Sequence, residues 1–250
     1  MLKSLDVRNK LYEDFHKISV PQNKIISKNN FTYRLILKVA EEYLDKSKTV
    51  LDIGCGSGTL DFYFANKGNK VYGIDTSKNA ISACKQSATK LRLSKSVNFD
   101  VMNFPNQIPK GKFDFVIFTE VIEHLRDDSK ALAVINKLLN NNGLMLLSTP
   151  SSNAPLHRIG LTKNFDQRVG HLRRYKLEEL EALCIENGFK IVYKKKIEGV
   201  LRNFLFVNPK AGKSVRFIKY FISDIMTFID DLTVPVFGES NIIIVAKKIN

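Results

Sequence analysis

The chain contains only three cysteines, Cys55, Cys84 and Cys184, and their spacing shows no pairing. Three isolated thiols cannot form a disulfide framework, and the ligand spacing of a zinc site is missing. The N-terminal residues mix charge into the sequence and lack the uninterrupted apolar stretch of a signal peptide. We therefore expect a cytoplasmic protein, and no metal is expected.

Acidic residues are scarce relative to basic ones, with 25 against 39, so the formal net charge is +14. Residues 151–250 carry the largest share of this excess positive charge, with 17 basic and 10 acidic side chains. This charge favours anionic partners without identifying one. The hydrophobic fraction of 44% and the charged fraction of 26% are typical of folded globular proteins and argue against disorder and against a membrane-spanning protein. A length of 250 residues favours one α/β core with an added lobe.

Strand-like and helix-like segments alternate along the chain. The expected strands lie at 49–53, 70–74, 97–101, 113–118 and 144–148. Such alternation implies right-handed crossovers and a parallel sheet with helices on both faces. Two later β-branched runs, 189–195 and 241–247, could pair as neighbouring strands.

The segment V-L-D-I-G-C-G-S-G-T is a strand that leads into three glycines, Gly54, Gly56 and Gly58. Backbone without side chains lets a ligand approach closely. The dinucleotide fingerprint fails here, because Thr59 stands where its third position needs glycine or alanine. Asp52 would repel a pyrophosphate and attract a cation. The loop therefore predicts a ligand that carries positive charge.

Two further motifs follow in order, V-Y-G-I-D at 71–75 and F-D-F-V-I-F-T-E-V-I-E-H-L at 113–125. With them the chain resembles the class I S-adenosylmethionine-dependent methyltransferases over roughly 48–195. The second motif is similar to that of the small-molecule branch, which includes quinone-ring, lipid and sugar methyltransferases. The resemblance implies an α/β fold, a Rossmann-like doubly wound seven-stranded sheet whose last strand is antiparallel. It also implies S-adenosyl-L-methionine as cofactor and S-adenosyl-L-homocysteine as product.

The resemblance assigns cofactor roles to the ends of the strands. It places the glycine loop under the methionine portion, and Asp75 can accept hydrogen bonds from both ribose hydroxyls. Asn103 stands where the family often has an aspartate for the adenine amino group. The full cofactor set comprises Asp52, Gly54, Cys55, Gly56, Gly58, Asp75, Thr76, Asn103, Phe104 and Thr119. Within it, we expect Cys55 to pack as a small side chain and not to react.

Candidate catalytic residues follow the fourth expected strand and precede the last crossover helix. If the acceptor is a hydroxyl or phenol, His124 or His171 could serve as the base. Glu120 and Glu123 are expected only to contact solvent or to cap a helix. The candidate acceptor-binding residues are Arg158, Arg173, Arg174 and Tyr175. The guanidinium groups of the three arginines suit a carboxylate or phosphate, and a solvated loop face is the alternative.

We expect one methyltransferase domain at 31–250, preceded by a cover segment at 1–30 and carrying inserts at 151–175 and 200–239. The second insert contains an apolar stripe at helical spacing: Phe217, Ile218, Phe221, Ile222, Ile225, Phe228, Ile229 and Leu232. We interpret it as a lid helix whose stripe packs on the enzyme. The alternative is peripheral contact with the inner face of a membrane through 213–233, which basic residues near the helix support.

The predicted function is methyl transfer to a small-molecule acceptor that is anionic, quinone-like, lipid-linked or a sugar-like hydroxyl. An RNA-modifying methyltransferase is the first alternative, because the charge of +14 attracts phosphate. The sequence lacks three patterns of nucleic-acid methyltransferases, namely an Asn-Pro-Pro-Tyr-like tetrad after the fourth strand, a Pro-Cys pair and a Lys-Asp-Lys-Glu pattern. The second alternative is a scaffold that binds S-adenosylmethionine without catalysis.

Overall fold

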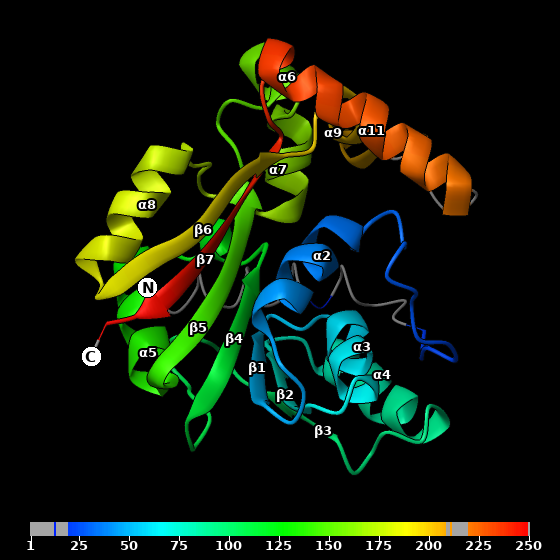
Figure 1. Cartoon of the computed structure of the whole chain (residues 1–250), viewed down its shortest axis with the longest axis vertical. Helices are drawn as coiled ribbons and strands as arrows, with labels where there is room; N and C mark the ends of the chain where they lie inside the picture. The colour runs from blue at the N-terminus through cyan, green and yellow to red at the C-terminus, as the bar shows by residue number, and fades with distance from the viewer. Residues whose placement is uncertain (1–12, 14–19, 209–210, 212–219, 250) are drawn as a thin grey trace.

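The computed structural model describes residues 13, 20–208, 211 and 220–249. Its centre is a seven-stranded sheet in the order β3-β2-β1-β4-β5-β7-β6 (Figure 1). The strands are β1 (Thr49–Ile53), β2 (Lys70–Asp75), β3 (Val97–Val101), β4 (Phe113–Thr119), β5 (Leu139–Pro150), β6 (Phe189–Ile197) and β7 (Asn241–Lys248). Neighbours among β1 to β5 pair in parallel, and β7 runs antiparallel to both β5 and β6. The predicted fold class is confirmed.

Helices cover both faces of this sheet, as the alternating pattern predicts. One face carries α2 (Arg34–Tyr43), α3 (Thr59–Asn66) and α4 (Lys78–Lys90), and the other carries α5 (Asp128–Leu138) and α8 (Leu177–Glu186). Successive residues of each strand point to opposite faces, so Val50 packs with the first group and Leu51 with the second. A strand buried on both faces reads as a continuous apolar run, which explains the composition of β1 and β4.

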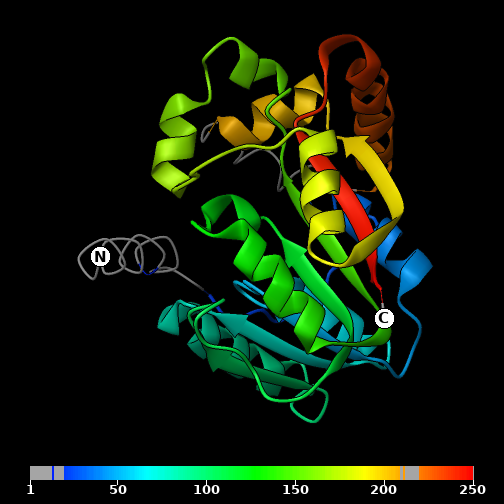
Figure 2. The same cartoon turned by 90° about the vertical axis from the view of Figure 1, so that its left-hand side faces the viewer.

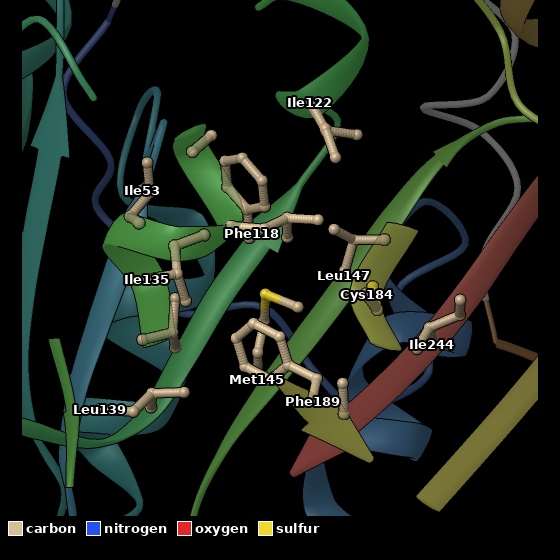
Figure 3. Close-up of a cluster of buried hydrophobic side chains, with 14 of the residues drawn as sticks. Ile53, Phe118, Ile122, Ile135, Leu139, Met145, Leu147, Cys184, Phe189 and Ile244 are labelled. Atoms are coloured by element: carbon tan, nitrogen blue, oxygen red, sulfur yellow. The ribbon is translucent and has the colours of Figure 1, made fainter. Parts of the chain in front are cut away.

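The core under α5 and α8 holds the strand ends in place (Figure 3). Phe118 of β4, Met145 and Leu147 of β5, and Phe189 of β6 are fully buried in it together with Ile135 of α5. Close packing of this kind transmits strain rather than absorbing it. The loops that follow β1, β2 and β4 are therefore carried on a rigid base.

The two inserts form a layer beyond one end of the sheet (Figures 1 and 2). The first contributes α6 (Pro155–Arg158) and α7 (Lys163–Val169), and the second contributes α9 (Val200–Val207) and α11 (Tyr220–Phe237). A short 3-10 helix, η1 (Ile122–His124), connects β4 to α5. Among the described residues, no helix combines the length and apolar character that crossing a bilayer requires.

Helix α11 has the opposite orientation from the one expected. Phe228 and Leu232 of the apolar stripe are exposed, whereas Ser223, Thr227 and Asp230 are buried. The expectation that the stripe packs on the enzyme is therefore wrong. The reason is a polar network under the helix, described below, which the hydrophobic pattern does not reveal. The stripe's first two members, at 217–218, lie outside the described residues.

Candidate active site

The glycine loop after β1 fits between the ends of β2 and β4. Gly54 has φ +77°, and a Cβ built there would lie 2.4 Å from Val121 Cγ2, so a side chain would collide with the segment after β4. The backbone N–H groups of Gly54 and Cys55 donate to Ile74 O at 2.8 and 3.0 Å. The loop is therefore fixed in a conformation that favours glycine and leaves its backbone uncovered by side chains of its own.

Asp75 ends β2 and faces this loop. Its Oδ2 accepts from Gly56 N at 2.9 Å, and its Oδ1 accepts from Ser77 N at 2.8 Å. Each carboxylate oxygen can accept more than one hydrogen bond, so a ribose diol can bind beside these backbone donors. The carboxyl ends of parallel strands are where open α/β sheets bind ligands. The arrangement fits the sugar of a nucleoside.

Two buried carboxyls, Asp52 and Asp61, lie beside the loop. Burial raises the pKa of Asp52 to about 7, and burial together with the neighbouring Asp52 raises the pKa of Asp61 well above its usual range. The pair therefore retains a proton at neutral pH and carries less than its full negative charge. Sequence reasoning found Asp52 and missed Asp61, which reads as an ordinary acid in the first turn of α3.

The remaining predicted cofactor positions lie near the same sheet edge. Burial raises the pKa of the Cys55 thiol well above its usual range, so it stays protonated, which agrees with a packing role. Phe104 is buried against Phe118 with ring centroids 6.0 Å apart. Asn103 N donates to Gln107 Oε1 at 2.8 Å in the loop after β3. The roles of these residues, with those of Thr76 and Thr119, stay predictions.

Two residues of the N-terminal segment contact this region and were not singled out from the sequence. Gln22 Nε2 donates to Ser57 O at 2.8 Å and to Thr59 Oγ1 at 2.9 Å. The Glu13 carboxylate accepts from Lys78 N at 2.7 Å, at the start of α4. These contacts join residues that are 35 to 65 positions apart, so no local pattern could have found them. The covering role of 1–30 stays a prediction, since 1–12 and 14–19 lie outside the described residues.

A cavity of about 330 Å³ opens beyond the end of β4. Its walls come from β4, β5, the two inserts and α2. Among its lining residues are Tyr33, Thr119, Glu120, Glu123, His124, Phe165, His171, Arg174, Glu198, Asn203, Phe206 and Val207. Both candidate histidines are therefore on the wall of one cavity, although 47 positions separate them in the sequence.

The two histidines lie side by side, with ring centroids 4.9 Å apart. His171 Nδ1 lies 2.8 Å from Asp166 Oδ1, and His124 Nδ1 lies 3.1 Å from Gly170 O. Because an acceptor oxygen faces each Nδ1, each ring is best assigned with its proton there. The Nε2 atoms then point toward a shared neighbour, the carboxyl of Glu123.

Glu123 is fully buried, so the expectation that it only contacts solvent or caps a helix is wrong. Its Oε2 accepts from Thr149 Oγ1 at 3.0 Å, while its Oε1 has no hydrogen-bond partner among the described residues. That oxygen lies 3.7 Å from His124 Nε2 and 3.8 Å from His171 Nε2. Burial, with the charge of Glu120, raises the pKa of Glu123 well above its usual range. These three ligand groups, all within 4.8 Å of one another, could also hold a metal ion.

Glu120 has a left-handed backbone conformation, with φ +56°, at the point where β4 ends. Its Oε1 accepts from Ser148 Oγ and from Asn241 Nδ2, both at 2.8 Å. A strained residue held this firmly is common at functional sites. It ties the ends of β4, β5 and β7 together at the mouth of the cavity.

The four candidate acceptor-binding residues do not come together. Of the four, Arg174 lines the cavity, and its guanidinium donates to Asp166 at 2.6 and 3.1 Å. Arg173 and Tyr175 both bond to Asp128, at 2.5 and 2.8 Å. Arg158 donates to Phe237 O at 3.3 Å. Their role in binding an acceptor stays a prediction.

Comparisons with known proteins agree with this geometry. A family model described as "Methyltransferase domain" matches residues 27–194, more than half of the chain. A ubiquinone biosynthesis O-methyltransferase from Pelagibacter ubique is 36% identical over 104 residues, which are 42% of this chain and 42% of that protein. The chain thus spans less than half the length of this curated relative.

Solved structures show the same fold. The Haemonchus contortus phosphoethanolamine N-methyltransferase 2 in complex with S-adenosyl-L-methionine has a TM-score of 0.65 at 16% identity, covering 87% of this chain and 53% of that one. The magnesium protoporphyrin IX methyltransferase from Synechocystis PCC 6803 with bound SAH has a TM-score of 0.58 at 20% identity, covering 88% and 82%. The chain belongs to the class I S-adenosylmethionine-dependent methyltransferase family.

Proposed function

We propose that this protein transfers the methyl group of S-adenosylmethionine to a hydroxyl or phenol oxygen of a small, uncharged acceptor. The observation that carries this proposal is the Asp166–His171 pair on the wall of a cavity that meets the cofactor region at Thr119. S-adenosylmethionine supplies an already activated methyl group. The protein's main tasks are then to align the acceptor oxygen, remove its proton and exclude water.

His171 is the base in this proposal. Burial opposes ionisation of Asp166, but hydrogen bonds from His171 and Arg174 outweigh it and hold the pKa of Asp166 well below its usual range. An ionised Asp166 orients the imidazole through Nδ1 and stabilises the imidazolium that forms when Nε2 takes the acceptor's proton. A base of this kind contributes about 100-fold to 10,000-fold.

Glu123 and His124 complete the acceptor side. A neutral Glu123 can donate a hydrogen bond from Oε1 to the acceptor, and His124, whose Nε2 lies 3.7 Å from that oxygen, positions the acceptor from the same cavity wall. The charge of Arg174 is matched by Asp166. These pairings favour an uncharged hydroxylated ring, or a sugar-like hydroxyl, over a carboxylate or phosphate.

The curated relative's name supports an oxygen acceptor, since it describes O-methylation in ubiquinone biosynthesis. A quinone-related or lipid-linked acceptor is therefore part of the proposal. Peripheral membrane contact through 213–233 belongs to it as well, because such an acceptor resides in a bilayer. The proposal also includes cofactor binding by the glycine loop and Asp75. It assigns a covering role over the acceptor to 1–30, 151–175 and 200–239.

The test is incubation with radiolabelled S-adenosylmethionine and fractionated cell extract. We expect label in the lipid or small-molecule fraction, as an O-methyl ether by mass spectrometry. Label in RNA, with steep salt dependence, would support the RNA alternative instead. S-adenosylmethionine binding without label in any fraction would support a scaffold.

A further inference from the structure

The side of α11 that faces away from the protein is apolar. This outer face consists of Ile225, Phe228, Ile229, Leu232 and Val236, which are 42%, 66%, 50%, 61% and 72% exposed. A helix on the surface of a globular protein normally turns its polar side outward. A contiguous row of large apolar side chains in water indicates an interaction surface.

The polar side of α11 fixes this orientation. Asp230 is fully buried and accepts from the backbone N–H groups of Gly199 and Leu201 at 2.8 and 2.9 Å, at the start of α9. Thr227 Oγ1 accepts from the buried Arg202 at 3.0 Å. Rotating the helix to bury its apolar side would leave these groups unpaired, which is costly for buried polar atoms. The outward apolar face is therefore a stable feature of the fold.

Arg34 secures the opposite end of the same polar side. It donates to Ser223 Oγ at 3.0 Å and pairs with Asp224 Oδ1 at 2.5 Å. The pairing neutralises an acid at the edge of the outer face.

One basic side chain beside α11 and the amino-acid sequence before this helix favour an anionic surface. Arg158 reaches the C-terminal end of α11, where it donates to Phe237 O. The sequence at 208–219, directly before α11, contains four basic residues and no acidic one. A second copy of this chain, also at +14, would be repelled, whereas anionic lipid would be attracted.

We propose that the outer face of α11 docks on a lipid bilayer that contains anionic lipids, with the helix lying in the membrane surface. An apolar face combined with basic residues is what binds helices to such an interface. Helix α9 packs on α11, and Asn203, Phe206 and Val207 of α9 line the cavity. Docking would therefore bring the cavity wall close to the membrane. The idea that the acceptor is drawn from the bilayer rests on the proposed function, whereas docking itself does not.

The test is flotation of the full chain with vesicles of phosphatidylcholine, with and without phosphatidylglycerol. We expect binding to the anionic vesicles, weakened by salt and by leaving out phosphatidylglycerol. Phe228→Asp combined with Leu232→Asp should lower the bound fraction about tenfold or more, because two apolar side chains can no longer be buried in lipid. The control is Ile185→Asp combined with Val192→Asp, which changes two exposed apolar residues of α8 and β6 and should float like the original chain.

Two further measurements separate failure of docking from failure of the proposed function and from dimerisation. They are turnover on a water-soluble phenol and the molecular mass of the protein by light scattering. Flotation without turnover would leave docking standing and overturn the proposed function. Turnover without flotation, or equal loss of flotation in both double variants, would overturn docking. A dimer that only the α11 variant dissociates would identify the outer face as a contact between two copies and contradict the proposal.

Discussion

His171 Nδ1 and Asp166 Oδ1 lie 2.8 Å apart, and Arg174 donates to both oxygens of the same carboxylate. Thr162 Oγ1 adds a further hydrogen bond to Asp166 Oδ2 at 2.9 Å. The carboxylate is therefore fixed before any acceptor binds, and it fixes the imidazole in turn. Such preorganisation is what general-base catalysis requires of a supporting residue.

Removing the base should lower turnover without affecting cofactor binding. His171→Asn is expected to reduce kcat by about 100-fold to 10,000-fold, because no base then removes the proton from the hydroxyl group of the methyl acceptor. Asp166→Asn should reduce kcat as well and change the pH–rate profile, since the imidazolium loses its counter-charge. Single-turnover kinetics provide the measurement, and an unchanged kcat in His171→Asn would contradict the assignment.

Two effects of replacing a glycine in the loop can be measured separately, namely the collision of a side chain with Val121 and the strain of a positive φ. Gly54 and Gly68 both have positive φ, +77° and +103°, so alanine at either position should cost about 1–2 kcal/mol of stability. A Cβ at Gly68 meets nothing within 4 Å, whereas one at Gly54 collides with Val121. We expect Gly54→Ala to lose more stability and also to lose affinity for S-adenosylmethionine, which calorimetry would show. Unchanged affinity in Gly54→Ala would argue against the loop as the binding site.

The buried pair of Asp52 and Asp61 should make stability depend on pH. Above pH 4 the native state keeps a proton that an unfolded aspartate loses, so the free energy of unfolding should fall from about pH 4 to at least pH 7. Asp61→Asn replaces the carboxyl that holds this proton with a neutral amide, so it should raise the unfolding temperature at pH 8 and flatten this dependence. Thermal unfolding between pH 5 and pH 8 provides the measurement. A steeper fall in the variant than in the original chain would contradict this explanation.

Asp114 lies near the start of β4, and its effect on the pH dependence of stability should be opposite to that of Asp52 and Asp61. Burial opposes its ionisation, but hydrogen bonds from Thr49 and Asn140 outweigh burial and lower its pKa. Its contribution to stability is therefore present above pH 4 and lost as the pH falls. Asp114→Asn should consequently destabilise the protein at neutral pH, the opposite result from Asp61→Asn.

The sequence predicts the sheet well because each strand is a local apolar run and the loop of Gly54, Gly56 and Gly58 is a local motif. It also identifies both His124 and His171, which the structure brings together. The orientation of α11 could not be predicted, because periodicity locates an apolar face without showing what that face contacts. Buried contacts of Arg202 and Asp230 decide it, and these join residues 28 positions apart.

The burial of Glu123 in the site was not predicted, for a related reason. An acid that follows a strand usually contacts solvent, and its burial here depends on Thr149 and on the loop that carries His171. The arginines of the long connection were grouped because they are close in sequence. In the structure each has its own nearby acceptor, so proximity along the chain did not become proximity in a site.

The most direct test is calorimetric titration of the purified chain with S-adenosylmethionine. We expect saturable binding at one site, weakened about 10-fold to 100-fold in Asp75→Asn, which loses charge-assisted hydrogen bonds to the ribose. The Asp114→Asn variant should bind like the original chain, because Asp114 lies at the start of β4, away from the carboxyl ends of the strands. No binding by the original chain, or equal affinity in the Asp75 variant, would contradict a cofactor site at the glycine loop and Asp75.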